Sequence, residues 1–152
     1  KAACFYEAMQ PEFKEYANQV IKNAKALENS LKEEGFRLVA GGTDNHLLLI
    51  DVKASCGISG KKAERLLDEI NITANKNAIP FDSEKPFKAS GIRVGTPAMT
   101  TKGFKEEDFI EVGKIIAYRL KNEETEEIKE ACLKRVKALT DKVEMYRDIK
   151  YI

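Results

Sequence analysis

Residues 90–97 read Ser-Gly-Ile-Arg-Val-Gly-Thr-Pro, and this stretch predicts a strand followed at once by a helix. The apolar residues between Gly91 and Gly95 favour a strand. The Thr-Pro pair that comes next is typical of an N-cap and a first helical position, so we expect a short helix that Gly103 ends. This prediction places a single arginine, Arg93, in a strand between two glycines.

Arg93 is the first candidate functional residue. A guanidinium can donate two parallel hydrogen bonds to a carboxylate, which makes arginine a common carboxylate ligand. The missing side chains at Gly91 and Gly95 would let a ligand come close to the backbone. Taken alone, however, an arginine in this setting is more often a surface residue or part of a salt bridge, so the motif needs support from the rest of the chain.

A long amphipathic helix is predicted over residues 11–34. Its apolar residues recur at spacings of three and four, the period of one helix face: Phe13, Ala17, Val20, Ala24, Leu27 and Leu31. Gly35 ends the helix, and Pro11 fits its first turn. Residues 1–10 are helix-like but start at Lys1 without Met and without a cap, so we expect the chain to be a piece of something longer.

Two strands follow, over residues 36–40 and 46–52. The Gly-Gly pair between them predicts an antiparallel hairpin with a loop of about five or six residues. Ser59 is the predicted cap of the next helix, whose apolar positions keep the helical period. We then expect a short third strand over 72–74 and an ordered polar loop over 75–85.

The remaining chain is predicted to be helical. One helix is marked by Phe109, Val112, Ile116 and Leu120, and another by Ile128, Cys132, Val136, Leu139 and Val143, with Asn122 at the junction. The order of elements predicts an α+β fold in which helices pack on one face of a small, mostly antiparallel sheet. A chain of 152 residues can bury one such core, so we expect a single domain.

The composition disfavours several classes of partner. Lys plus Arg (26) nearly cancel Asp plus Glu (25), so no global field attracts nucleic acid or an anionic membrane surface. No apolar run approaches the roughly 20 residues that span a bilayer, and the N-terminus lacks a signal-peptide pattern. We therefore expect a cytoplasmic protein that binds small molecules or protein, with no nucleic-acid or membrane partner.

The three cysteines are far apart and form no CxxC pair, which argues against both a disulfide framework and a zinc site. We expect Cys4 and Cys132 to be buried free thiols. Cys56 falls in a polar segment over 54–57, expected to be a loop, where a reactive thiol is the less favoured alternative.

Two more polar positions could carry chemistry. His46 is expected to be a turn or core histidine rather than a catalytic base. Asn77, beside Lys76, could offer a donor and an acceptor to a heterocycle, but an Asn in a loop before Pro is usually turn chemistry. The sequence contains no P-loop, GxGxxG or HExxH motif.

Four motifs, taken together and in order, closely resemble the C-terminal domain of bacterial serine hydroxymethyltransferase. They are Gly41-Gly42-Thr43-Asp44-Asn45-His46, Asn75-Lys76-Asn77, Pro86-Phe87 and residues 90–98. The resemblance implies the small domain of a fold-type I pyridoxal phosphate enzyme. In this reading residues 1–10 are a remnant of the interdomain helix, 11–103 the α/β core and 104–152 the C-terminal helices.

The family uses pyridoxal phosphate to exchange serine and tetrahydrofolate for glycine and 5,10-methylenetetrahydrofolate, and its whole enzyme is a homodimer. The resemblance implies that Arg93 binds the amino-acid carboxylate and that Asn77 contacts the folate, with the loop over 75–82 walling that pocket. The family's Schiff-base lysine and cofactor-binding residues belong to a large N-terminal domain and have no counterpart here. The resemblance therefore implies that this piece binds no cofactor and is inactive alone.

Two alternatives remain open at this stage. The chain could be a stand-alone α+β module in which Arg93 holds a small carboxylate. It could also be the small domain of another pyridoxal phosphate enzyme, such as an aminotransferase, which carries a similar arginine; the Asn75-Lys76-Asn77 motif favours the hydroxymethyltransferase. If a neighbouring domain is missing, the apolar residues of segment 2–9 should be exposed and promote self-association.

Overall fold

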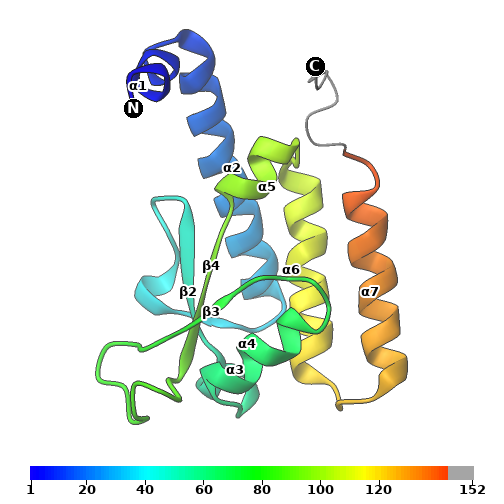
Figure 1. The fold of residues 1–152 in the computed structure, drawn as a ribbon. Helices are drawn as coiled ribbons and strands as arrows, with labels where there is room; N and C mark the ends of the chain where they lie inside the picture. Colours follow the sequence, from blue (N-terminus) through cyan, green and yellow to red (C-terminus); the bar gives the residue numbers. More distant parts are fainter. Residues whose placement is uncertain (144–152) are drawn as a thin grey trace.

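The structure, a computed structural model, describes residues 1–143. In this part of the chain four antiparallel strands form a sheet in the order β1-β2-β4-β3. The strands are β1 (Arg37–Leu38), β2 (Leu47–Asp51), β3 (Asn75–Asn77) and β4 (Gly91–Gly95). Figure 1 shows the sheet on one side of the molecule with three long helices side by side behind it. The predicted α+β architecture is confirmed.

The long helix α2 (Pro11–Glu33) has the predicted bounds and the predicted apolar face. Its buried residues Ala24, Leu27 and Leu31 face the sheet, and Gly35 ends the helix region with a φ of 75° that favours glycine. The short helix α1 (Ala2–Ala8) precedes it and has no buried residue. Figure 1 shows α1 at the far end of α2, away from the body of the domain.

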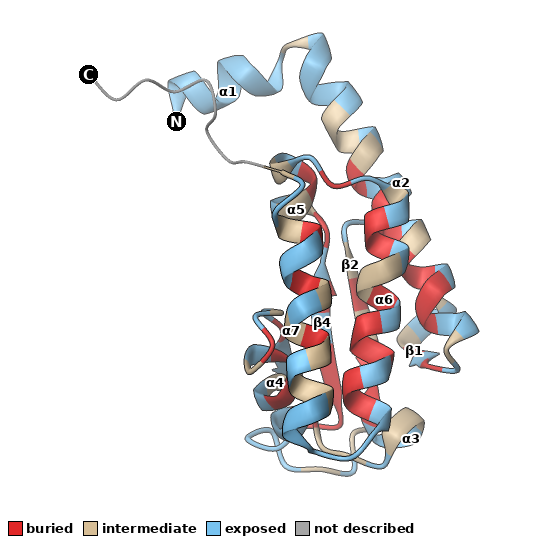
Figure 2. Ribbon diagram, turned by 90° about the vertical axis from the view of Figure 1, so that its right-hand side faces the viewer, coloured by how far each residue is buried: buried red, intermediate tan, exposed pale blue. Residues whose placement is uncertain are grey.

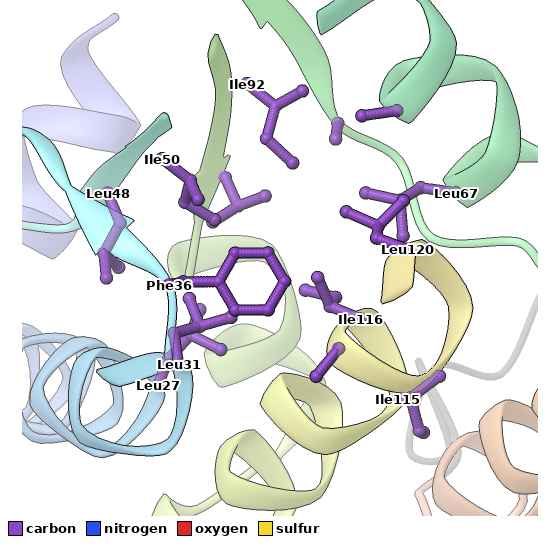
Figure 3. Close-up of a cluster of buried hydrophobic side chains, with 14 of the residues drawn as sticks. Leu27, Leu31, Phe36, Leu48, Ile50, Leu67, Ile92, Ile115, Ile116 and Leu120 are labelled. Atoms are coloured by element: carbon purple, nitrogen blue, oxygen red, sulfur yellow. The ribbon is translucent and has the colours of Figure 1, made fainter. Parts of the chain in front are cut away.

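Helices α6 (Glu106–Lys121) and α7 (Glu126–Thr140) complete the helical layer. Seen from the helix side, they lie in front of the strands (Figure 2). Their buried residues join those of α2 and the sheet in one apolar core, so the helices after residue 103 share a core with those before it. Figure 3 shows this core around Phe36, with the labelled side chains Leu27, Leu31, Leu48, Ile50, Leu67, Ile92, Ile115, Ile116 and Leu120. Residues 144–152 of the predicted C-terminal helices lie outside the described part.

The structure also has three shorter helices in the core: α3 (Val52–Cys56) and α4 (Gly60–Asp68) lie between β2 and β3, and α5 (Pro97–Lys102) follows β4. As predicted, Ser59 caps α4, and its hydroxyl accepts a hydrogen bond from the Lys62 amide at 3.3 Å. The first residue of α4 is Gly60, and a side chain there would overlap the carbonyl oxygen of Gly91. Close packing of α4 on β4 therefore depends on this glycine.

Strand β4 has the predicted bounds, but two other strand predictions were wrong. The strand expected over 36–40 is limited to Arg37–Leu38, because Val39–Gly41 turns into a 3-10 segment in which Ala40 has a φ of 61°. The expected strand over 72–74 is also absent. Ile72 packs against the core instead. Pairing with β4 begins at Asn75, directly after the end of the predicted strand.

Three local predictions were also wrong. The segment 54–57 is mostly helix α3 rather than a loop, since the Asp51 carboxylate caps it by accepting from the Ala54 amide at 2.9 Å. Cys4 is exposed, because α1 packs no face against the core. Thr96 precedes α5 as expected, but its hydroxyl donates to the Val20 carbonyl at 3.0 Å instead of capping the helix.

Candidate functional site

The sheet has one face toward the helices and one face away from them. On β4, Ile92 and Val94 are buried on the helix side, whereas Arg93 is exposed. Because side chains alternate along a strand, Arg93 lies on the opposite, open face. The strand register places Arg93 directly across from Leu49 of β2 and Asn75 of β3. The open-face residues around Arg93 are Leu47, Leu49, Asn75, Asn77 and Gly95, and Arg37, Asp51 and Gly91 continue this face along the sheet.

Arg93 is available to a ligand from outside the described chain. Within residues 1–143, no carboxylate lies within ion-pair distance of its guanidinium. The other open-face arginine, Arg37, instead forms an ion pair with the buried carboxylate of Asp51. An exposed, unpaired guanidinium on a rigid strand suits bidentate binding of a carboxylate.

The two glycines beside Arg93 differ in role. Gly95 is exposed. A Cβ at this position would lie 3.3 Å from the His46 carbonyl oxygen, and the next neighbouring atom would be 3.7 Å away. Gly91 is buried, and a Cβ there would lie 2.7 Å from the Ile79 side chain. The expectation that a ligand approaches the backbone at Gly91 was therefore wrong, because the chain's own loop occupies that space.

Asn77 ends the edge strand β3, across from Gly91. Its side-chain amide donates to the Ala78 carbonyl at 2.7 Å. Within the described residues no donor contacts its side-chain oxygen, so that oxygen remains an acceptor. Asn77 and Arg93 thus lie on neighbouring strands of the same face, as a binding site for an anion and a polar ring would require.

The ordered loop was predicted over 75–85, but Asn75–Asn77 form β3, and the loop instead runs over 78–90, where Asp82 holds it. The Asp82 carboxylate accepts from the amides of Ile79, Glu84 and Ser90 at 3.2, 2.9 and 3.0 Å, and from the Ser90 hydroxyl at 2.5 Å. These bonds, led by that of the Ser90 hydroxyl, lower the pKa of Asp82 to about 2. The loop thereby keeps a fixed shape next to Asn77 while it exposes Phe81 and Phe87.

The Gly-Gly turn before β2 is fixed by a buried carboxylate. Glu28 accepts from the Thr43 amide at 2.9 Å and from the ammonium groups of Lys25 and Lys32. Burial alone would raise the pKa of Glu28, but these hydrogen bonds outweigh it and lower the pKa to about 2. A Cβ at Gly42 would lie 2.5 Å from the Glu28 carboxylate, so a larger residue would displace this carboxylate from the turn.

The turn borders a groove on the open face. Its volume is about 460 Å³, and its walls include the turn residues 41–45 together with Leu47 and Leu49. Since Leu49 is the register partner of Arg93, the groove and the arginine lie next to each other. His46 is exposed at the start of β2, and its carbonyl accepts from the Thr96 amide at 3.0 Å. The turn prediction for His46 fits this position.

Cys56 and Cys132 carry no sign of reactivity. Burial raises the pKa of the Cys56 thiol and of the Cys132 thiol, which disfavours the nucleophilic thiolate. Cys132 is buried as predicted. Across residues 1–143 there is no cluster of three or more metal-ligating side chains, and none of the helices described is long and apolar enough to cross a bilayer.

The open face does not fit pyridoxal phosphate by itself. An aldehyde cofactor needs an amine for covalent attachment, yet none of the side chains that the described strands place on this face is a lysine. The ammonium group of Lys76, on the opposite side of β3, is paired with Glu64. The residues present here offer a guanidinium and amides, which are ligands for a carboxylate and a heterocycle.

Fold and site together define a class of protein, a small α+β domain whose sheet presents ligand-binding side chains on its uncovered face. Residues 1–116 match the family model for serine hydroxymethyltransferase. The chain belongs to the serine hydroxymethyltransferase family.

Three curated relatives illustrate this membership. The chain is 56% identical to the serine hydroxymethyltransferase of Mycoplasma capricolum over 151 residues, which cover 99% of this chain and 36% of that protein. The same values hold for the Mycoplasma mycoides serine hydroxymethyltransferase. The Crocosphaera subtropica serine hydroxymethyltransferase is 56% identical over 146 residues, 96% of this chain and 34% of the relative. The chain thus spans about a third of the length of the curated relatives it matches.

The resemblance seen in the sequence motifs is thereby confirmed, since all four motifs lie within the matched residues. The roles of Arg93 and Asn77 stay predictions. Sequence reasoning missed three carboxylates that position this site: Glu28, Glu64 and Asp82. Their bonds are made mainly with backbone amides, and no spacing pattern in the sequence reports such contacts.

Proposed function

We propose that this chain is the substrate-binding small domain of a serine hydroxymethyltransferase, the enzyme that interconverts serine plus tetrahydrofolate with glycine plus 5,10-methylenetetrahydrofolate. The observation that carries the proposal is the exposed Arg93 on the open face, one strand away from Asn77 and without an ion-pair partner within residues 1–143. Family membership supports the reaction class, and the arrangement of Arg93 and Asn77 on one face supports binding of the two substrates there.

Each residue has a role that its chemistry supports. Arg93 binds the α-carboxylate of serine or glycine through two parallel hydrogen bonds. Asn77 offers its side-chain oxygen as an acceptor, and its amide as a donor, to the folate ring system. Side chains on neighbouring strands lie about 5 to 8 Å apart, so the two substrates would meet above β3 and β4.

Pyridoxal phosphate, when bound in the whole enzyme, supplies the electron sink for cleavage at the amino-acid α-carbon. Residues that hold it are proposed to lie in a large N-terminal domain, since the open face has no lysine to attach it. In this proposal residues 1–10 continue the interdomain helix, 11–103 form the α/β core and 104–152 the C-terminal helices. The whole enzyme is a cytoplasmic homodimer, and the 152 residues alone are inactive.

The test is to replace Arg93 by lysine in the whole enzyme. Arg93→Lys keeps the positive charge but loses the planar fork, so kcat/KM for serine should fall at least about 100-fold. Arg37→Lys is the matched control, because Arg37 lies on the same face but already pairs with Asp51; it should leave serine kinetics within about twofold. Serine kinetics of Arg93→Lys within twofold of wild type would overturn the proposed role.

The second candidate function is a stand-alone module that binds a small carboxylate. It is favoured because Arg93 has no carboxylate partner among the described residues, 1–143. Calorimetry with glycine, serine and folate on the 152-residue chain separates the two ideas. A Kd below about 1 mM supports the module, whereas one half of a divided site should bind far more weakly.

A further inference from the structure

The strand that carries Asn77 has little support from the sheet. β3 has 3 residues and, in the described part of the chain, pairs only with β4, so no described strand lies at its second edge. A strand this short at a sheet edge is weakly held by its own hydrogen bonds. Its residues, Asn-Lys-Asn, also have low strand propensity. A side chain that binds a ligand from such a strand needs another group to hold the backbone in place.

Glu64 of α4 provides that group. One of its carboxylate oxygens accepts from the backbone amide of Lys76 at 2.9 Å. The other oxygen accepts from the Lys76 ammonium at 3.3 Å. Helix α4 is itself fixed to the sheet, because the Gly60 amide donates to the Ala89 carbonyl and Gly60 packs on Gly91 of β4. Glu64 therefore ties the free edge of β3 to a helix that is anchored on β4.

We propose that Glu64 is a positioning residue for folate binding by Asn77. This inference rests on the proposed function. Lys76 directly precedes Asn77, so the bond to the Lys76 amide fixes the peptide plane between Asn75 and Lys76 and holds the backbone one residue before Asn77. On the other side of Asn77, Asp82 holds the amide of Ile79 at 3.2 Å. Asn77 is thereby clamped between two carboxylates, which keeps its side chain at the geometry that a ring ligand needs.

The backbone bond, rather than the ion pair, carries this effect. The side chains of Lys76 and Glu64 are 37% and 28% exposed, and an ion pair in that setting contributes little. A backbone amide that donates to a carboxylate makes a stronger, directional bond. Lys76→Met keeps the amide and loses only the ammonium, so it should behave like wild type. Glu64→Gln keeps an oxygen acceptor for the Lys76 amide, so this variant should bind folate nearly as well as wild type.

The experiment uses the whole enzyme and compares KM for tetrahydrofolate with KM for serine. Glu64→Ala should raise the folate KM about tenfold. The serine KM should change less than about twofold, because Arg93 lies on β4, which pairs with a strand on each side. Glu64→Asp, which is one methylene too short to reach, should match Glu64→Ala, and Glu64→Gln should restore the folate KM to within about threefold. Thermal unfolding shows that each variant is folded.

Each outcome decides a separate point. If Glu64→Ala and Glu64→Asp leave the folate KM unchanged while Asn77→Ala raises it, Glu64 does not position Asn77 and the inference falls, but the proposed function stands. If Asn77→Ala leaves the folate KM unchanged, the folate role of Asn77 falls. Equal rises in both KM values, or a large effect of Lys76→Met, would mean general structural damage and would also overturn the inference.

Discussion

At the scale of single residues, carboxylates rather than apolar contacts fix the turns around the open face. Glu28 and Asp82 each accept backbone amides, and each has a pKa lowered to about 2. A carboxylate with such partners costs little to keep ionised, whereas its removal leaves several donors without a partner. These two residues therefore keep the Gly-Gly turn and the loop over 78–90 in one conformation without needing a larger core.

Asp82→Ala should destabilise the domain in a pH-dependent way. The folded-state pKa of Asp82, about 2, lies below its ordinary value of 3.8, so ionisation favours the folded state. The stabilisation is full above the ordinary pKa and is lost as the pH falls toward the folded pKa. Urea unfolding at pH 7 should show a loss of about 1 kcal/mol, and the difference between wild type and variant should shrink between about pH 4 and pH 2.

Asp44→Ala is the control for this prediction, since the exposed Asp44 carboxylate has only Lys25 nearby, at 3.8 Å. It should change the free energy of unfolding by less than about 0.5 kcal/mol at any of these pH values. A difference between wild type and Asp82→Ala that stays constant down to pH 2 would contradict the assigned pKa.

At the scale of elements, the sequence predicted the helices and strands whose apolar residues repeat with a regular period. Helix α2 and strand β4 have their expected bounds, because their buried faces repeat at the helix and strand periods. Residues 39–40 are apolar and were expected to belong to a strand, but the positive φ of Ala40 turns the chain there. Strand β3 was missed because Glu64 and the pairing with Arg93 hold a segment of low strand propensity, and tertiary contacts of this kind leave no periodic signal.

For the candidate site, too, the sequence predicted the residues but not their arrangement. Arg93 and Asn77 were identified from motifs, but their position on one face follows from a strand register that sequence reasoning did not reach. The expected role of Gly91 was wrong for a related reason, since Ile79, at the start of the loop over 78–90, fills the space beside it. Long-range packing, unlike helix and strand periods, has to be seen in the structure.

Gly60→Ala tests how tightly α4 is seated against β4. The new methyl group would overlap the Gly91 carbonyl oxygen, a backbone atom that cannot rotate away. The domain should lose about 1–3 kcal/mol of unfolding free energy, measured by urea denaturation. Lys61→Ala, at the next residue with its exposed side chain, should cost less than about 0.5 kcal/mol. Equal stability of the two variants would show that α4 can shift without penalty.

At the scale of the whole molecule, α1 is an apolar surface outside the core. Phe5, Tyr6 and Met9 are 64%, 70% and 81% exposed, and α1 buries none of its residues. Figure 1 shows that α1 lies beyond the helical layer, at the end of α2. Grouped exposed apolar side chains favour association, because contact with another surface removes them from water.

The 152-residue chain alone should therefore self-associate through α1 at high concentration, as read by light scattering after gel filtration. Replacing Phe5, Tyr6 and Met9 together by Gln keeps helix propensity and should give a monomer. Phe81→Gln is the control, because Phe81 is fully exposed but lies on the loop over 78–90 rather than on α1; that variant should associate like wild type. A wild-type chain that stays monodisperse and monomeric, or a monomer produced by Phe81→Gln, would show that α1 is not the associating surface.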